Sequence, residues 1–303
     1  PTPHHPTPKE QHVMNRPQPS ARVLRTAAAV VAAAILLTGC ATTASSNTPS
    51  ANCTPKDAGL TTFTPGTLTV GVPENPPYTK LDGTTASGEE IQIIEKLAAA
   101  ECLSVAYVPI TYANGIAMIT SQKRTDIITG GWYVTAARAA QVGFTTPTYY
   151  DQMAIISKSG IDTVSGLETI GAVGTGTGFS WQDDVTKILG DNLKLYPGTA
   201  EMKQDLEAGR IQAALDGYAV AAAAYKGSGF EVKPAQADSR VAITTNMPII
   251  AFPIDKDNTA LSNAFSALID QYRTDGTLAS IVEADGLSAS LVVPADKAAT
   301  ALR

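Results

Sequence analysis

The chain has 303 residues, of which 44% are hydrophobic and 17% charged, and this composition is typical of a folded protein with one large or two modest lobes. The formal net charge is −6, and without residues 1–39 it becomes −9, with 18 Lys and Arg against 27 Asp and Glu. So acidic a body excludes nucleic-acid binding, which needs clustered Lys and Arg.

The N-terminal residues have the pattern of an export signal. Residues 1–13 precede Met14, and we interpret them as a leader or a mis-set start. Residues 14–39 combine arginines with an apolar stretch, Thr26–Gly39, that is shorter than the roughly 20 residues needed to span a bilayer and is typical of a signal peptide. It ends in "LTGC", which resembles the lipobox of bacterial lipoproteins and predicts a lipidated Cys40. The alternative is a short anchor helix with an incidental cysteine.

Cleavage of this signal limits the chemistry of the mature protein. The chain's three histidines lie at positions 4, 5 and 12, so the mature protein has none. This excludes Ser-His and Cys-His catalysis and His-ligated metal sites, and we expect no metal and no cofactor. Cys53 and Cys102 remain as a pair in an oxidising compartment, which predicts a disulfide; two free buried thiols are the alternative.

The rest of the chain alternates predicted strands and helices. Residues 40–65 are rich in Ser, Thr, Ala and Pro and predict a flexible tether. The first series then contains strands 68–72, 104–110 and 125–129 and helices 89–102 and 115–123. The second contains strands 153–157, 169–173, 193–197 and 211–216 and helices 181–190, 199–209 and 219–226. This alternation predicts α/β units on mainly parallel sheets, whose ligands bind at the carboxyl ends of the strands.

Three loops at predicted strand ends have unusual chemistry. "GGWYVTAAR" combines flexible glycines with Thr135 as a helix N-cap and Arg138, which together could form a carboxylate site; the alternative is a solvated arginine on an ordinary surface helix. "GTGTGFSWQDD" carries Phe179 and Trp181 on a glycine-rich turn but lacks the order of a nucleotide-binding loop. Asp216 follows an apolar strand and could pair with an ammonium group or cap the next helix.

Five motifs in order resemble one protein family. They are "LTVGVPENPPY", "SGEEIQIIEKLA", "TSQKRTDIITGGWYVTAARAAQVGFTTPTYY", "LEAGRIQAALDGYAVAAAAYK" and "ALIDQYRTDGTLASIVEADG". Together they resemble the substrate-binding lipoproteins of bacterial polar amino-acid ABC importers, the extracellular solute-binding family 3 with a type II periplasmic-binding fold. The resemblance runs from about Thr67 to Leu291.

The resemblance implies a role for each matching residue. Arg138 would hold the ligand carboxylate, and Asp216 would take its ammonium group. The backbone of the turn before Thr135 would complete these contacts, and the glycine/threonine loop would bond the carboxylate from the other lobe. The remaining expected binding residues are Glu74, Asn75, Tyr78, Tyr112, Gly130, Gly131, Trp132, Tyr133, Thr175, Thr177, Phe179 and Trp181.

Several positions depart from the family pattern. Tyr133 stands where a small hydroxyl residue is usual, and Glu89 replaces a common aromatic. The glycine/threonine loop is longer by about two residues, and Asp216 lies one position early. These departures indicate modified amino-acid recognition or a ligand other than a standard amino acid. The aromatic walls suit a flat or bulky side chain, whereas Glu74 or Glu89 suits a cationic one.

The implied fold has two α/β lobes, each a mainly parallel sheet flanked by helices, joined by two crossover strands near Tyr150–Gln152 and Met247–Ala251. Lobe 1 would comprise residues 66–150 and 250–293, lobe 2 residues 151–249, and residues 294–303 a C-terminal tail. The implied function is a monomeric, lipid-anchored extracytoplasmic binding protein, on the periplasmic or cell-surface side. It would deliver an amino acid or related zwitterion to an ABC permease and its ATPase. The alternatives are an enzyme such as a dehydratase on the same fold, using Glu74, Glu89 or Asp216, and a non-transport receptor.

Overall fold

A computed structural model describes residue 49 and residues 52–298. The chain divides into residues 1–44 and residues 45–303, and all structural statements below concern the second unit. The predicted leader, the signal peptide, Cys40 and the end of the C-terminal tail lie outside the described residues. No helix in the described part of the chain has the length and apolar character needed to cross a membrane.

Lobe 1 is built on a five-stranded sheet in which three strands are parallel and β14 is antiparallel to both of its neighbours. In sheet order the strands are β4 (Ser104–Pro109), β1 (Thr67–Val72), β5 (Ile127–Ile128), β14 (Pro253–Ile254) and β6 (Gly143–Phe144). The accompanying elements are the hairpin β2 (Lys80–Asp82) and β3 (Thr85–Ser87) and helices α1 (Glu89–Ala100), α2 (Gly115–Thr120), α3 (Ala136–Ala139), α8 (Thr259–Thr274), α9 (Thr277–Ala284) and α10 (Ala295–Ala298). A 3₁₀ turn, Ala289–Leu291, lies between α9 and α10.

Burial explains why the first lobe folds around β1 and α1. Leu68 and Val70 of β1 and Ile91 and Ile94 of α1 are fully or almost fully buried and belong to one hydrophobic cluster. A strand with one face in the core needs apolar residues at alternate positions, as at Leu68 and Val70, and a helix needs an apolar stripe with a period near 3.6 residues. Both patterns are present in the sequence, and both elements form where they were predicted.

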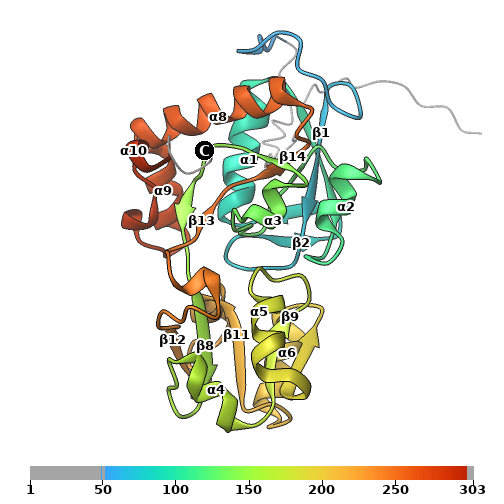
Figure 1. The fold of residues 1–303 in the computed structure, drawn as a ribbon. Coiled ribbons are helices and arrows are strands. Elements are labelled where there is room, and N and C mark those ends of the chain that lie inside the picture. Colours follow the sequence, from blue (N-terminus) through green and yellow to red (C-terminus); the bar gives the residue numbers. More distant parts are fainter. Residues whose placement is uncertain (1–48, 50–51, 299–303) are drawn as a thin grey trace, which may run out of the picture. The chain divides into compact units, whose positions relative to one another are not determined.

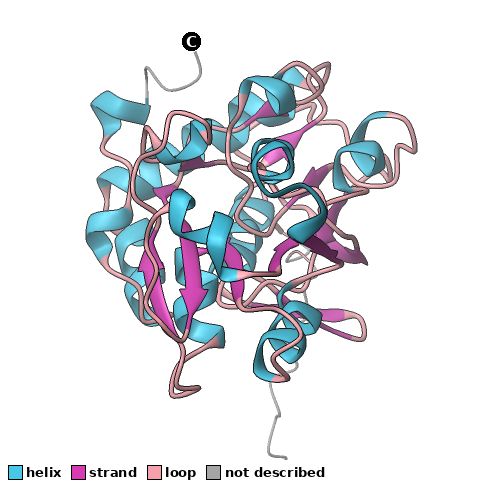
Figure 2. Ribbon diagram, turned by 60° about the horizontal axis from the view of Figure 1, so that its bottom comes forward, coloured by secondary structure: helices cyan, strands magenta, loops and turns pink. Residues whose placement is uncertain are grey.

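Lobe 2 repeats the arrangement with strand order β10 (Leu193–Tyr196), β9 (Val173–Gly176), β11 (Ala213–Gly217), β8 (Met153–Ser157) and β12 (Glu231–Pro234). Its helices are α4 (Val164–Ile170), α5 (Gln182–Leu189), α6 (Thr199–Glu207) and α7 (Tyr218–Ala224), with 3₁₀ turns at Gly190–Asn192 and Ala242–Thr244. Figures 1 and 2 show helices flanking the strands of both lobes. The two-lobed α/β fold predicted from the sequence is therefore confirmed.

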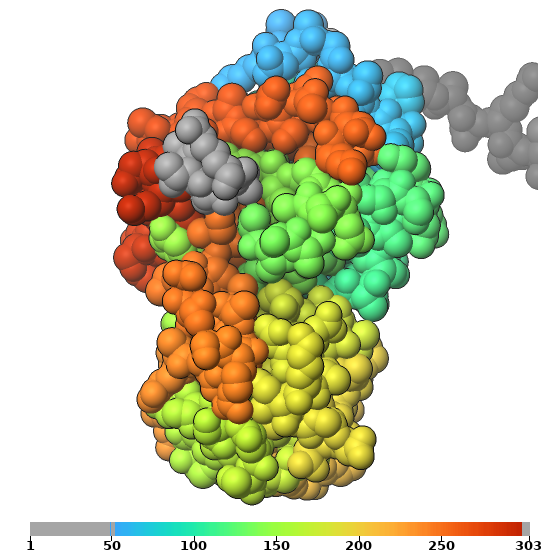
Figure 3. Space-filling view, viewed as in Figure 1, coloured from blue at the N-terminus to red at the C-terminus, as the bar shows by residue number. Residues whose placement is uncertain are grey.

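Two short strands carry the chain between the lobes. β7 (Tyr149–Tyr150) leads from lobe 1 into β8, and β13 (Ile249–Ile250) leads back towards β14. They pair antiparallel, with Tyr149 opposite Ile250 and Tyr150 opposite Ile249. The lobes are thus joined by a two-stranded hinge, as predicted. In the view of Figure 3 the surfaces of the two lobes meet directly beside this hinge.

The strand predicted at residues 169–173 lies further along the chain. Ile170 ends α4, and β9 begins only at Val173, so much of the predicted glycine loop is a buried strand. A Cβ at Gly174 would lie 2.6 Å from Ile211 and 3.0 Å from Met202. Glycine is therefore needed for α6 and the loop before β11 to pack closely on this strand, a requirement that depends on residues far away in sequence.

Residues 52–65, expected to belong to a flexible tether, are fastened to lobe 1. Cys53 forms a disulfide with Cys102, which confirms the predicted pair. The Phe63 amide donates to Asp126 over 2.8 Å, and the Asp57 amide donates to Glu101 over 2.9 Å. The segment therefore packs on the lobe as part of it, because the disulfide and buried acceptors hold its backbone.

Candidate ligand-binding site

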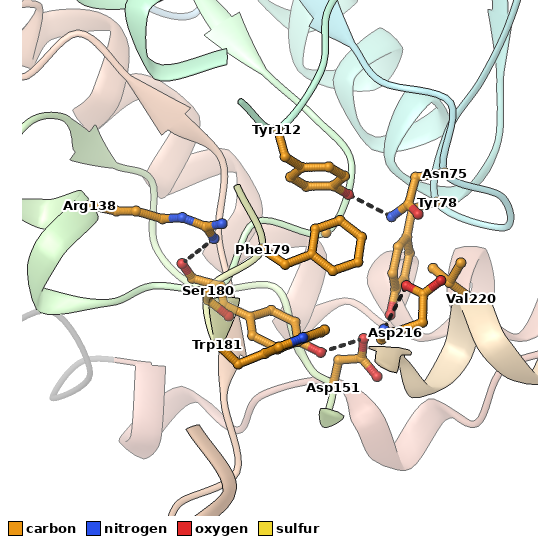
Figure 4. A pocket seen from close by; sticks show the side chains of 13 residues that line it. Asn75, Tyr78, Tyr112, Arg138, Asp151, Phe179, Ser180, Trp181, Asp216 and Val220 are labelled. Atoms are coloured by element: carbon orange, nitrogen blue, oxygen red, sulfur yellow. Dashed lines mark hydrogen bonds between the residues drawn. The ribbon is translucent and has the colours of Figure 1, made fainter. Parts of the chain in front are cut away.

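A cavity lies between the lobes at the carboxyl ends of their strands. The lining residues are Asn75, Tyr78, Tyr112, Gly131, Tyr133, Arg138, Asp151, Phe179, Ser180, Trp181, Asp216, Gly217 and Val220 (Figure 4). Most of the predicted binding residues are therefore brought together, with Asp151, Ser180, Gly217 and Val220 as additional members.

Among the residues that the structure describes, no acidic side chain pairs with the buried cation of Arg138. Thr135 caps α3 by accepting a hydrogen bond from the Arg138 amide, which fixes the start of this short helix. The guanidinium donates to the carbonyl oxygens of Tyr133, over 2.9 Å, and Gly178, over 3.1 Å. It lies 4.6 Å from the ring centroid of Trp132. None of the salt bridges within residues 52–298 involves it.

Burial lowers the pKa of Arg138 to about 10, so the side chain still carries its charge at neutral pH. A charge taken out of water is costly unless an opposite charge meets it. The planar guanidinium is suited to bind a carboxylate. Its position in the wall of the cavity makes it an anchor for the carboxylate of a ligand.

Two buried carboxylates lie on the other side of the cavity from Arg138 (Figure 4). Asp216, at the end of β11, accepts hydrogen bonds from the Thr199 hydroxyl over 2.6 Å and from the Gly217 amide over 2.8 Å. Burial raises its pKa to about 7. This places its proton equilibrium in the physiological range, where a cationic ligand would shift it towards the ionised form.

Asp151 is the second carboxylate, and it lies in the hinge just after β7. It accepts from the Tyr133 hydroxyl over 2.9 Å and from the Ala219 amide over 3.4 Å. Burial raises its pKa, and these hydrogen bonds oppose the rise. Asp151 was not among the binding residues predicted from the sequence. The available signal was an aspartate directly after the crossover motif "TPTYY".

Aromatic rings from both lobes form a continuous arc around the cavity. Tyr112 lies with its ring centroid 5.0 Å from Trp132 and 5.0 Å from Phe179, the latter edge-to-face at 85°. Phe179 and Trp181 meet at 5.3 Å and 78°, and Trp181 lies 5.9 Å from Tyr133. The predicted aromatic walls are therefore built from residues of lobe 1 and lobe 2 in contact with one another.

The glycine turn before Tyr133 is organised by Glu90, a residue that the sequence analysis did not identify. Its buried carboxylate accepts hydrogen bonds from the amides of Gly130 and Gly131 and from the Tyr149 hydroxyl. Both glycines have positive φ, at 115° and 75°, and a Cβ at Gly131 would lie 2.8 Å from the Tyr78 ring. The N–H groups that were expected to meet the ligand are thus engaged by Glu90.

The remaining predicted residues support the lining from behind. Thr175 is buried and accepts a hydrogen bond from the Trp181 indole over 2.8 Å, and the Thr177 amide bonds to the Tyr196 carbonyl. Glu74 is exposed and accepts a hydrogen bond from the Leu81 amide. The predicted residues that do not line the cavity are Glu74, Gly130, Trp132, Thr135, Thr175 and Thr177. Within residues 52–298, no group of His, Cys, Asp and Glu side chains is arranged to hold a metal ion.

Comparison with known proteins shows which family the chain belongs to. The model of bacterial extracellular solute-binding proteins, family 3, matches residues 68–284, which is most of the chain. The chain belongs to this family. The family therefore identifies it as a solute-binding protein with an extracytoplasmic location. No curated protein matches the sequence.

Solved structures of similar fold include amino-acid-binding proteins. An ancestral arginine-binding protein bound to arginine has 25% identity and a TM-score of 0.64, over 73% of this chain and 98% of that chain. The cysteine-binding protein of Campylobacter jejuni has 20% identity and a TM-score of 0.66, over 76% and 95%. A substrate-binding protein of an ABC uptake transporter from Streptococcus pneumoniae, bound to histidine, has 18% identity and a TM-score of 0.64, over 73% and 92%.

Proposed function

We propose that this protein captures an amino acid or a related small zwitterion between its lobes and delivers it to an ABC permease and its ATPase. The observation that carries the proposal is the separation of charge in one cavity. Arg138 supplies an unpaired cation on one side, and Asp151 and Asp216 supply carboxylates on the other. A zwitterion matches both, since its carboxylate meets the guanidinium and its cationic group meets the aspartates.

Ligand capture would be coupled to closure of the lobes. Arg138 belongs to lobe 1 and bonds to the Gly178 carbonyl of lobe 2, and the Tyr112–Phe179 and Tyr133–Trp181 ring pairs also join the lobes. A ligand held by Arg138 and Asp216 together would favour the closed form, because it gains both contacts only there. A transport complex could then distinguish the loaded protein from the empty one.

The proposal is tested by calorimetry of the purified protein against a panel of amino acids and other small zwitterions, with Arg138→Met as the variant. Because this variant removes the guanidinium that would pair with the ligand carboxylate, it is expected to weaken binding at least tenfold, roughly 1.4 kcal/mol or more. Arg210→Met is the matched control, because Arg210 pairs with Asp205 on the surface. Equal affinity of the wild-type protein and Arg138→Met would contradict the carboxylate assignment.

We further propose that the protein is a monomer held to the outer face of the cell membrane by a lipid on Cys40. The support is the "LTGC" sequence after a basic and apolar signal segment. Expression of the full chain in a bacterial host, with fractionation and mass spectrometry, tests it. A lipid-modified fragment from the membrane fraction is expected, and Cys40→Ser should release the protein. A membrane-bound Cys40→Ser variant would contradict lipid anchoring.

A further inference from the structure

The cavity offers a cationic group several aromatic rings, together with two carboxylates whose oxygens each already accept a hydrogen bond from the protein. We propose that the preferred ligand is a compact zwitterion whose nitrogen is N-methylated, such as a di- or trimethylated amino acid. This inference rests on the proposed function, because it refines the class of zwitterion that the same cavity binds. Three observations support it.

The first observation is that several oxygens in and beside the cavity already accept hydrogen bonds from the protein, whereas the lining hydroxyl of Ser180 has no partner within the described residues. The Gly130 carbonyl receives both the Asn75 amide, over 3.0 Å, and the Tyr112 hydroxyl. The Tyr133 and Gly178 carbonyls each receive a bond from Arg138. A primary ammonium has three N–H groups to satisfy in a buried site, whereas a trimethylated nitrogen has none.

The same holds for the carboxylates. Asp216 uses both oxygens, one for the Thr199 hydroxyl and one for the Gly217 amide. Asp151 likewise uses one oxygen for Tyr133 and the other for the Ala219 amide. Their negative charge still attracts a cation at longer range, because Coulomb attraction in a buried site does not require an N–H bond.

The second observation is the number and geometry of the rings that line the cavity. The lining contains five aromatic side chains: Tyr78, Tyr112, Tyr133, Phe179 and Trp181. Phe179 stands nearly perpendicular to both Tyr112 and Trp181, at 85° and 78°. Perpendicular rings expose faces and edges in different directions, and aromatic faces are the surfaces that recognise quaternary ammonium groups.

The third observation is the placement of the charged groups relative to these rings. In Figure 4 Arg138 enters from one side, Phe179 and Trp181 occupy the middle, and Asp216 lies on the opposite side. Trp132 is already occupied by the Arg138 guanidinium at 4.6 Å. The other rings remain to surround the cationic end of a ligand whose carboxylate meets Arg138.

The experiment measures Kd by calorimetry for two series that differ only in N-methylation. The first series is glycine, N-methylglycine, N,N-dimethylglycine and trimethylglycine, and the second is proline and N,N-dimethylproline. Affinity is expected to rise with methylation in at least one series, by roughly tenfold between its ends. A decrease with each methyl in both series, or no binding of any methylated member, would overturn the inference.

A ring variant separates recognition by aromatic faces from simple shape. Phe179→Leu keeps an apolar side chain but removes the face, and it should weaken the methylated ligand more than the unmethylated one. Phe230→Leu is the matched control, because Phe230 packs on Tyr225 away from the cavity. Equal losses for both kinds of ligand in Phe179→Leu would also overturn the inference.

The two proposals fail in different ways. If unmethylated amino acids bind with Arg138-dependent affinity and methylated ones do not, the zwitterion function stands and the inference fails. If neither these series nor any standard amino acid binds, the proposed function fails together with the inference.

Discussion

The Arg138 guanidinium in lobe 1 donates a hydrogen bond to the Gly178 carbonyl in lobe 2, over 3.1 Å. The same side chain lines the cavity and has no acidic partner within the described residues. Arg138 therefore has two roles, since it can bind a ligand carboxylate and it also forms a contact between the lobes. This relationship explains how ligand charge and lobe closure can be coupled through a single side chain.

Gly178→Ala is expected to weaken ligand binding about tenfold or more. Gly178 has φ of 84°, and a Cβ there would lie 2.7 Å from the backbone of Tyr112 in the other lobe. The closed arrangement would have to open slightly, which loses the contacts that closure brings. Calorimetry of both proteins measures the change.

Gly209→Ala is the control for this substitution. Gly209 also has positive φ, at 73°, but a Cβ there would meet nothing within 4 Å. It carries the backbone strain of the change without the contact between lobes. If both variants bind ligand equally well, the close contact with Tyr112 is not the reason why residue 178 is a glycine.

Ligand affinity is expected to fall as the pH drops below 7. Burial raises the pKa of Asp216 to about 7, and binding a cation requires its ionised form. Above this pH the carboxylate is already ionised, and below it each pH unit should cost about tenfold in affinity. Calorimetry between pH 5 and pH 8 checks the slope, and Asp216→Asn should flatten it. A steep slope retained in Asp216→Asn would assign the effect to another group.

Glu89→Gln is expected to stabilise the protein above pH 5. Glu89 is fully buried, and neither carboxylate oxygen has a hydrogen-bond partner within residues 52–298. Burial, together with the nearby Glu90, raises its pKa to about 9. The protonated form is therefore favoured in the folded state. Stability is lost as pH rises from the unfolded pKa towards 9, at about 1.4 kcal/mol per unit.

Urea unfolding at pH 5 and pH 8 tests this expectation. At pH 8 we expect Glu89→Gln to be more stable than the wild-type protein by about 2–4 kcal/mol, with a smaller difference at pH 5. Glu283→Gln is the control, because Glu283 is an exposed residue of α9. Equal stability changes at the two pH values would show that the Glu89 carboxyl is not the titrating group.

Removing the disulfide with Cys53→Ser and Cys102→Ser is expected to lower the free energy of unfolding by about 4 kcal/mol. The two cysteines are 49 residues apart, so the bond restricts a long loop in the unfolded chain. Denaturant unfolding measures the change, and ligand affinity should be retained because the bond lies outside the cavity lining. A loss of affinity in the folded double variant would contradict this separation.

Much of the fold follows from local sequence patterns. The buried alternation in β1 and the apolar stripe of α1 specify a strand and a helix from neighbouring residues alone. The errors occurred where long-range packing decides. The segment Val173–Gly176 carries two glycines and was assigned partly to a loop, yet it is a buried strand because Met202 and Ile211 pack against Gly174.

The candidate site was predictable where chain-local chemistry marks it. Thr135 before Arg138 and the aromatic pair after the glycine loop were visible in sequence, and Arg138, Phe179 and Trp181 line the cavity. Glu90 was not visible in this way. Its importance comes from accepting the Gly130 and Gly131 amides about 40 residues away, and no local pattern encodes that pairing.

The sequence by itself determined that this is an acidic α/β chain with Arg138 at a helix start, because helix caps, apolar periodicity and charge are properties of neighbouring residues. The tertiary structure alone decided that Asp151 shares a cavity with Arg138 and Asp216 and that each oxygen of the two aspartates accepts a hydrogen bond from the protein. Burial and hydrogen-bond pairing depend on segments that meet only when the lobes and hinge are assembled. For that reason, the arrangement of charges in the cavity and the kind of ligand it would bind depend on the tertiary fold.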